Sequence, residues 1–222
     1  MKRMVLLLPL AAALTLAAPA FAQEYLLTYD GFDYHVAAGG STRYLDVGDQ
    51  YFSLGFVPGA YPGRLDGAVD FTNNEYTYNT YDLTVVSSAL NSGLLVVSFD
   101  NANGRTRYYE DPIASGTPGD YGSPGTLTDG VMALGGRTYS VIVTYDSNSE
   151  NGSFVGCVDF DEGTLLTLFP PADRVGWIVS GGLAGPPEVI PAGFDHHAIG
   201  FCYRPTSPTI HKTWGAIKAL YR

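Results

Sequence analysis

The chain has 222 residues, of which 45% are hydrophobic and 13% aromatic, and its formal net charge at pH 7 is −10. This hydrophobic content excludes a disordered chain, and an acidic surface repels phosphate backbones, which argues against nucleic acid as a partner. All 22 acidic residues lie between Gln23 and Pro205, a stretch without lysine. We therefore expect one folded, acidic domain of ordinary size.

Residues 1–22 have the pattern of a secretory signal peptide. Two basic residues near the start precede an apolar run, and the motif Ala-Phe-Ala at 20–22 fits a signal-peptidase site. The apolar run is too short to span a membrane, which takes about 20 residues. The sequence predicts a soluble, exported bacterial protein that begins at Gln23, in the periplasm, outside the cell or on the cell surface.

Strand patterns dominate residues 23–204, which we expect to form a single β-domain. Short runs rich in β-branched and aromatic residues are separated by Gly, Asn, Asp and Pro. This region lacks the helical periodicity that the crossovers of a parallel sheet require. The pattern predicts an antiparallel β-sandwich, of which a jelly roll is one form, with about eleven strands. The expected strands are Glu24–Tyr29, Tyr51–Val57, Gly67–Phe71, Tyr76–Val86, Leu94–Phe99, Thr106–Glu110, Thr138–Tyr145, Ser153–Phe160, Thr164–Phe169, Gly176–Ser180 and Ala198–Arg204.

Local patterns also predict how some strands face and connect. Strict alternation places the four alternate residues from Tyr139 to Tyr145 on one face. Asp100–Gly104 and Asp146–Gly152 contain Asn-Gly and are typical of hairpin turns. The Gly/Pro-rich stretch Asp111–Gly130 is expected to be one long loop.

The last residues differ from the body of the chain. Residues 205–212 predict an extended linker, and residues 213–222 a short, basic, amphipathic helix capped by Thr213. Such a short helix needs a partner to be stable. It would dock either on its own domain or on export or surface-assembly machinery. The side chains expected to make this contact are Trp214, Ile217, Lys218 and Leu220.

Cys157 and Cys202 are the only cysteines. An even number of cysteines in an exported protein favours a disulfide, which here would close a loop of about 46 residues and contribute roughly 4 kcal/mol. The sequence therefore predicts a Cys157–Cys202 bridge, with two free buried thiols as the alternative.

Two polar clusters are candidate metal sites. Asp146, Asn148 and Glu150 place oxygen ligands at alternate positions, as calcium loops do, although the Glu that closes an EF-hand loop is missing. His196 and His197 are adjacent, so on an extended segment they point to opposite faces and cannot share one metal without a bend. We expect no cofactor, with calcium at 146–150 as the one alternative.

Exposed aromatic rings beside amides and carboxylates could bind sugars, because aromatic rings stack on pyranose faces. The candidates are Tyr76, Tyr78, Tyr81, Tyr108 and Tyr109, and a half-buried strand surface is the alternative explanation for them.

The sequence contains no Gly-x-Ser-x-Gly elbow, and no pair of carboxylates has a distinctive spacing. We therefore expect a non-enzymatic exported protein with a structural or cell-surface role. A carbohydrate-binding module is the alternative, and a secreted hydrolase is a third possibility.

Overall fold

The computed structural model of the protein describes residues 22–39, 44–185 and 189–206. The all-β prediction is confirmed: in this part of the chain the helical elements are three short 3₁₀ turns. The predicted signal peptide, most of the linker and the predicted C-terminal helix lie outside the described residues. The elements are β1 (Ala22–Val36), β2 (Gln50–Ala60), β3 (Asn74–Asn91), β4 (Leu94–Phe99), β5 (Arg105–Pro112), η1 (Pro124–Leu127), β6 (Val131–Asp146), β7 (Asn151–Glu162), η2 (Thr164–Leu168), η3 (Pro171–Asp173), β8 (Trp177–Ala184) and β9 (His196–Thr206).

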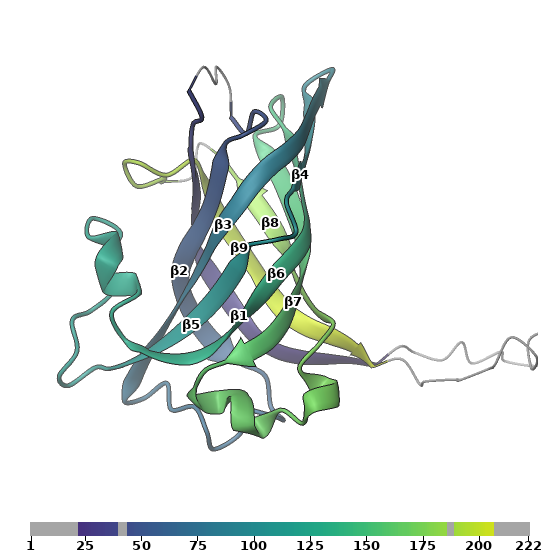
Figure 1. Ribbon diagram of the computed structural model, residues 1–222. Helices are drawn as coiled ribbons and strands as arrows, with labels where there is room; N and C mark the ends of the chain where they lie inside the picture. The colour runs from purple at the N-terminus through teal and green to yellow at the C-terminus, as the bar shows by residue number, and fades with distance from the viewer. Residues whose placement is uncertain (1–21, 40–43, 186–188, 207–222) are drawn as a thin grey trace, which may run out of the picture. The chain divides into compact units, whose positions relative to one another are not determined.

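The strands form one closed antiparallel barrel rather than the two facing sheets of the predicted sandwich (Figure 1). Their order is β2-β1-β9-β8-β7-β6-β4-β3-β5, and the further pairings β2–β3 and β5–β6 close the ring. Apart from β4 and β5, consecutive strands are neighbours, so the barrel is an up-and-down meander. Closure removes the exposed edges that an open sheet would present.

β4 and β5 lie end to end at one position in the ring, between β3 and β6, so the barrel has eight strand positions. β4 pairs with the second half of β3, and β5 pairs with its first half. The predicted hairpin at Asp100–Gly104 is therefore wrong, because this segment links β4 and β5 in the same direction instead of reversing the chain. The hairpin at Asp146–Gly152 is confirmed, since β6 and β7 pair from Asp146 and Asn151 onward.

Two predicted strands adopt other structures. Gly67–Phe71 forms turns, and Thr164–Phe169 is largely the 3₁₀ helix η2. Gly163, with φ of +109°, ends β7 and directs the chain into η2. A short apolar run has the same pattern in a strand and in a segment that covers a core.

A β-bulge changes the facing of β6. The pairing with β7 shifts between Tyr139 and Ile142, and Ser140 has φ of +53°. Such a bulge inserts one residue and moves the alternation to the other face. Val141 and Val143 consequently point into the barrel, whereas the Tyr139 hydroxyl donates to the Asp159 carboxylate on the outer face.

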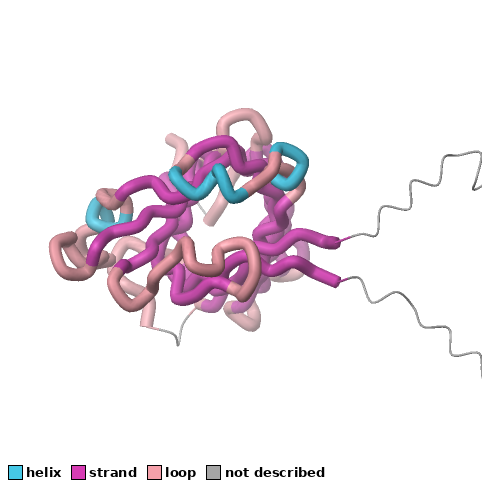
Figure 2. The backbone as a smooth tube through the Cα atoms, turned by 90° about the horizontal axis from the view of Figure 1, so that it is seen from below, coloured by secondary structure: helices cyan, strands magenta, loops and turns pink. Residues whose placement is uncertain are grey.

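The barrel interior is a packed core. Two clusters of buried side chains fill it, and Phe154 packs against both. The cluster next to η2, which we call the lower cluster, includes Trp177 and Phe169, with Leu65 from the β2–β3 segment. The other, called the upper cluster, includes Leu45 from the segment before β2. Seen from below, the strands form a ring, with η2 and η3 at the end that faces the viewer (Figure 2). The buried side chains of the two clusters fill the interior of this ring. An eight-stranded barrel has an interior of about the size that side chains alone can fill.

One glycine position explains how a large ring fits inside. A Cβ at Gly200 on β9 would lie 2.7 Å from the Tyr29 hydroxyl oxygen, so only glycine leaves room for that phenol. The same hydroxyl donates to the carbonyl of Ser180 at 3.1 Å. The glycine therefore allows Tyr29 to cross the interior toward β8.

Among the described residues, no helix has the length and apolar character needed to cross a membrane.

Candidate functional site, an aromatic groove on the outer wall

The structure separates the five tyrosines that were predicted to form a sugar-binding face. Tyr76, Tyr78 and Tyr108 are buried inside the barrel, where they belong to the lower cluster. Tyr81 and Tyr109 are half-buried on the outer side, and the Arg107 guanidinium lies 5.4 Å from the centroid of the Tyr81 ring. The prediction of one aromatic face from these residues is therefore wrong, because strand alternation sends three of them inward.

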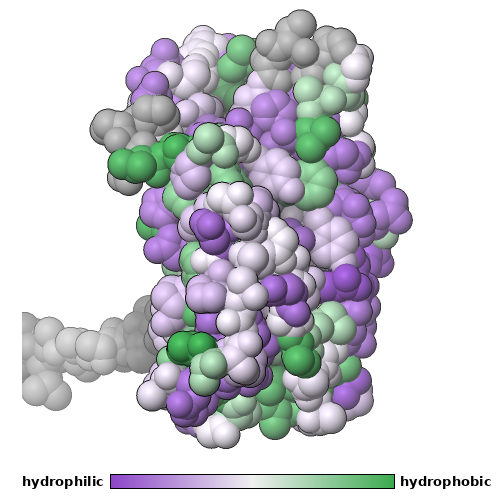
Figure 3. All heavy atoms as spheres, turned by 90° about the vertical axis from the view of Figure 1, so that its left-hand side faces the viewer, coloured by the Kyte–Doolittle hydropathy of each residue, from purple (hydrophilic) through white to green (hydrophobic). Residues whose placement is uncertain are grey.

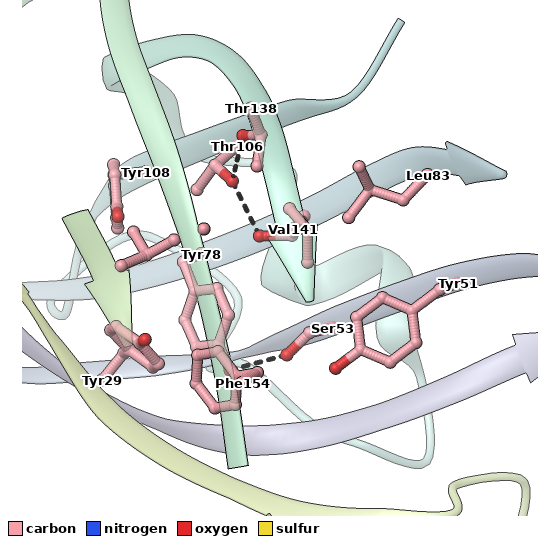
Figure 4. A pocket seen from close by; sticks show the side chains of 13 residues that line it. Tyr29, Tyr51, Ser53, Tyr78, Leu83, Thr106, Tyr108, Thr138, Val141 and Phe154 are labelled. Carbon is pink, nitrogen blue, oxygen red and sulfur yellow. Dashed lines mark hydrogen bonds between the residues drawn. The ribbon is translucent and has the colours of Figure 1, made fainter. Parts of the chain in front are cut away.

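Tyr78 and Tyr108 line a small interior cavity of about 40 Å³, together with Tyr29 and Tyr51 (Figure 4). Tyr78 and Ser53 share a hydrogen bond of 3.1 Å across it, and burial raises the pKa of the Tyr78 hydroxyl. Hydroxyls of Thr80, Thr106 and Thr138 form a chain with distances of 2.8 and 2.7 Å. A cavity of this size has room for about two or three water molecules. It is part of the core rather than a pocket for an organic ligand.

The predicted disulfide is absent, since Cys157 and Cys202 are both free. Cys157 pairs with Ile178 on β8, and Cys202 pairs with the next residue, Val179. Neighbouring residues of a strand point to opposite faces, so one thiol faces outward and the other inward. Two strand spacings also separate the cysteines by about 9–10 Å, beyond the roughly 7 Å that a disulfide can bridge.

The predicted calcium loop forms the β6–β7 turn. The Asp146 carboxylate accepts hydrogen bonds from the backbone N–H of Asn148, the side-chain amide of Asn148 and the hydroxyl of Ser149. These bonds lower the pKa of Asp146, the Asn148 backbone bond first. The carboxylate thus closes its own turn. Within the described residues, no group of three or more His, Cys, Asp or Glu side chains could hold a metal ion.

Of the tail residues, Trp214, Ile217, Lys218 and Leu220 lie outside the described residues, so the structure does not place them.

The seam between β1 and β9 carries three Asp–His pairs. Asp33 and His196 face inward with a distance of 3.1 Å, and the Asp33 side chain is fully buried. His197 faces outward, where its Nε2 lies 2.6 Å from the Asp30 carboxylate. The expected opposite facing of His196 and His197 is confirmed.

The inward pair is the centre of a polar cluster. The Tyr44 hydroxyl donates to Asp33 Oδ2 at 2.8 Å, and the backbone N–H of His196 donates to Asp33 Oδ1 at 2.8 Å. The ring of Tyr145 lies 4.3 Å from that of His196. Burial, followed by the Asp33 charge, raises the pKa of Tyr44. This cluster joins β1, β9 and the segment before β2.

The third pair attaches the β8–β9 loop to β1. The Asp195 carboxylate lies 2.8 Å from His35 Nδ1 and accepts the backbone N–H of His35 at 2.9 Å. The backbone N–H of Asp195 donates to the carbonyl of Asp33 at 2.8 Å. These bonds fix the position of the preceding residue, Phe194.

The β5–β6 loop is also held against the outer wall of the barrel, through contacts with β3. Leu127 of η1 is fully buried, and its carbonyl accepts the Thr77 hydroxyl at 2.8 Å. The Glu75 carboxylate accepts the backbone N–H of Gly119 at 2.7 Å. This loop thereby brings Tyr121 over β1.

A groove of about 460 Å³ lies where these two loops meet β1, and we call it the aromatic groove. Tyr34 and Tyr121 form its walls together with Phe194, whose ring stands at 88° to Tyr34 and 83° to Tyr121 with centroids 5.6 and 5.7 Å away. Phe52 stacks on Tyr34 at 4.9 Å and 8° and supports it. The residues that line the groove are Tyr34, Tyr121, Gly122, Pro124, Ala192, Gly193 and Phe194.

No protein-family model, curated protein or solved structure matches this chain.

None of the three aromatic residues of the groove was predicted from the sequence. One signal was available: Tyr121 precedes a glycine and Phe194 follows one, each within a loop rich in Gly and Pro. Aromatic residues on loops held by a rigid scaffold are common in binding sites. The position of Tyr34 depends on barrel closure, which the sequence did not reveal.

Proposed function

We propose that the protein is an exported carbohydrate-binding protein and that the aromatic groove is its binding site. The observation that carries the proposal is the Phe194 ring, which stands nearly perpendicular to Tyr34 of β1 and to Tyr121, with Phe194 and Tyr121 on two anchored loops. The groove volume of about 460 Å³ lies within the range of small-molecule sites. Phenol rings offer both an apolar face and a hydroxyl, which suits the C–H face and the hydroxyls of a sugar ring.

Two further features support an outer site for an uncharged ligand. The interior is filled by side chains, and segments at both ends pack onto it. The domain carries all 22 acidic residues of the chain, which repel anionic ligands. The side of the barrel on which η1 lies shows hydrophilic and intermediate residues with separate hydrophobic patches (Figure 3).

The test is binding of the full chain to an array of neutral and anionic glycans. We expect binding to a subset of neutral glycans, weakened about tenfold or more by Tyr34→Ala and Phe194→Ala, as at other aromatic binding residues. Tyr139→Ala is the matched control, because Tyr139 lies outward on β6, across the ring from β1. Failure to bind any glycan, or equal binding by all variants, would contradict the proposal.

A structural role at the cell surface is the second candidate. The packed interior and the contacts at both barrel ends favour it, because they make a rigid body. Both candidate functions include export of the protein. Intact-mass measurement of exported protein should give a chain that begins at Gln23, and retention of residues 1–22 would contradict this.

A further inference from the structure

A second hollow, of about 710 Å³, lies on the outer wall over β8 and β9. Small residues contribute to its lining, namely Ser153, Ser180, Gly181, Gly182 and Gly200. Its other lining residues include Asp30, half of whose side chain is exposed, and the half-exposed Ile199. Hydroxyls, a carboxylate and apolar groups therefore meet in one shallow depression.

An outer aromatic cluster adjoins this hollow. Phe201 lines the hollow, and its ring lies 5.4 Å from Tyr25 and 5.6 Å from Tyr203. Tyr61 adds a fourth ring, 4.8 Å from Tyr25. This cluster repeats the combination of phenol and phenyl rings found in the aromatic groove.

The hollow is also connected to the aromatic groove. Asp30 lines the hollow and bonds His197, whose ring lies 5.2 Å from Phe32. Phe32 in turn lies 5.6 Å from Phe194, which lines the groove. A chain of direct contacts therefore runs from one depression to the other.

These features lie along one strand. Tyr25 belongs to the outer aromatic cluster, Thr28 and Asp30 line the hollow, and Tyr34 lines the aromatic groove. Nine residue steps of a β-strand cover about 30 Å. The resulting strip is much longer than a single sugar ring.

We propose that the strip along β1 holds a linear, uncharged oligosaccharide, with successive rings in the aromatic groove, the hollow and the outer aromatic cluster. This inference rests on the carbohydrate-binding function proposed above and extends it to the ligand's length. The acidic body disfavours a polyanion. A peptide strand is disfavoured because β1, β8 and β9 already pair on both sides within the closed ring.

The decisive variant is Gly182→Leu. A Cβ at Gly182 would have its nearest atom, the Gly152 carbonyl oxygen, at 3.9 Å, so a side chain fits there and fills the hollow. Ser98→Leu on β4 is the matched control, since it adds the same side chain at a position outside the strip. Both variants are compared with the wild-type full chain by calorimetric titration with a length series of one neutral oligosaccharide identified on the array.

Wild-type affinity should rise with chain length, as linked contacts predict. Gly182→Leu should bind the shortest ligands like wild type and lose about tenfold affinity for the longest ones, and Ser98→Leu should lose none. Phe201→Ala should show the same length-dependent loss, which guards against a folding defect in one variant.

Unchanged affinity of both variants for long chains would overturn the extended site while leaving the groove intact. Affinity that does not rise with length would do the same. Absence of all glycan binding would overturn this inference together with the proposed function. Binding that Tyr34→Ala weakens but Gly182→Leu and Phe201→Ala leave unchanged would overturn the extended site alone.

Discussion

The two thiols differ in their surroundings. Cys202 is buried beside the Tyr108 hydroxyl, and burial raises its pKa far above that of an ordinary thiol. Cys157 lies half-buried on the outer face, where burial and then the Asp159 charge raise its pKa. Neither thiol is therefore activated for reaction at neutral pH.

We predict two reactive thiols in the denatured, unreduced full chain. In the native protein Cys157 should react slowly and Cys202 should be protected until the barrel unfolds. Thiol labelling followed by intact-mass measurement counts the reactive thiols in the denatured and in the native protein. Finding no reactive thiol after denaturation without reductant would show that a disulfide exists and that the register of β7, β8 and β9 is wrong.

Asp33 is the most consequential polar residue of the core. Its buried carboxylate accepts bonds from the Tyr44 hydroxyl and from the backbone of His196. Asp33→Ala should lower the free energy of unfolding by about 3 kcal/mol, because buried donors lose their acceptor. Urea denaturation measures this loss.

His35→Ala serves as the comparison, since His35 bonds the partly exposed Asp195 and should cost less than about 1 kcal/mol. Equal effects of Asp33→Ala and His35→Ala would contradict the central role assigned to the buried cluster.

To predict from the sequence which side chains face the interior, one must know which set of alternate residues in each strand points inward. The tyrosines at 76, 78 and 108 were found as a group, but alternation alone does not say which face is inside. The bulge at Ser140 reversed the facing of Tyr139 relative to Val141. Only the pairing of each strand with its neighbours shows which of its residues face inward.

At the level of elements, most strands could be predicted, and Leu94–Phe99 has the same bounds in sequence and structure. Gly67–Phe71 could not, because Asp70 caps a turn there: its carboxylate accepts bonds from Thr72 and Asn73. η2 could not either, since its apolar residues cover the barrel end and have no strand partner to reveal it.

An ion-pair network links β5 to the end of β7. Glu162 Oε1 lies 2.8 Å from Arg107 Nε and 2.6 Å from an Arg105 nitrogen. The hydrogen bond from Arg107, followed by that from Arg105, lowers the pKa of Glu162 despite partial burial. Its folded-state pKa is thus below the unfolded value near 4.5.

This shift predicts a dependence of stability on pH. The network should stabilise the barrel above pH about 4.5 and lose that contribution as pH falls through the lowered pKa of Glu162. Because the side chains are partly exposed, the contribution should be about 1 kcal/mol or less.

Urea denaturation of wild type and Glu162→Gln at pH 7 and pH 3 tests this: the difference between the two proteins should shrink at pH 3. A difference that grows on acidification would contradict the assigned direction.

At the level of the whole molecule, the sequence predicted the class of fold and missed its closure. A sandwich and a barrel share alternating strands and turns, and they differ in whether the first and last strands meet. Here β1 and β9 meet, with the Asp–His pairs along their seam. Histidines separated from their partners by more than 150 residues gave no sequence signal of that contact.

Closure also determines where function can lie. Because the interior is packed and segments cover both ends, the binding site that we propose lies on the outer wall, where the loops and β1 form the aromatic groove. The candidate site thus depends on residues 34, 121 and 194, which only the closed fold brings together.

The most direct test of this assignment is an NMR titration of the full chain, with labelled Tyr and Phe rings, by a neutral oligosaccharide that it binds. We predict ring-proton shifts at Tyr34, Tyr121 and Phe194, while the interior rings of Tyr78 and Tyr108 keep their positions. Shifts concentrated in the interior rings, or an unchanged groove under saturating ligand, would contradict the outer-wall site.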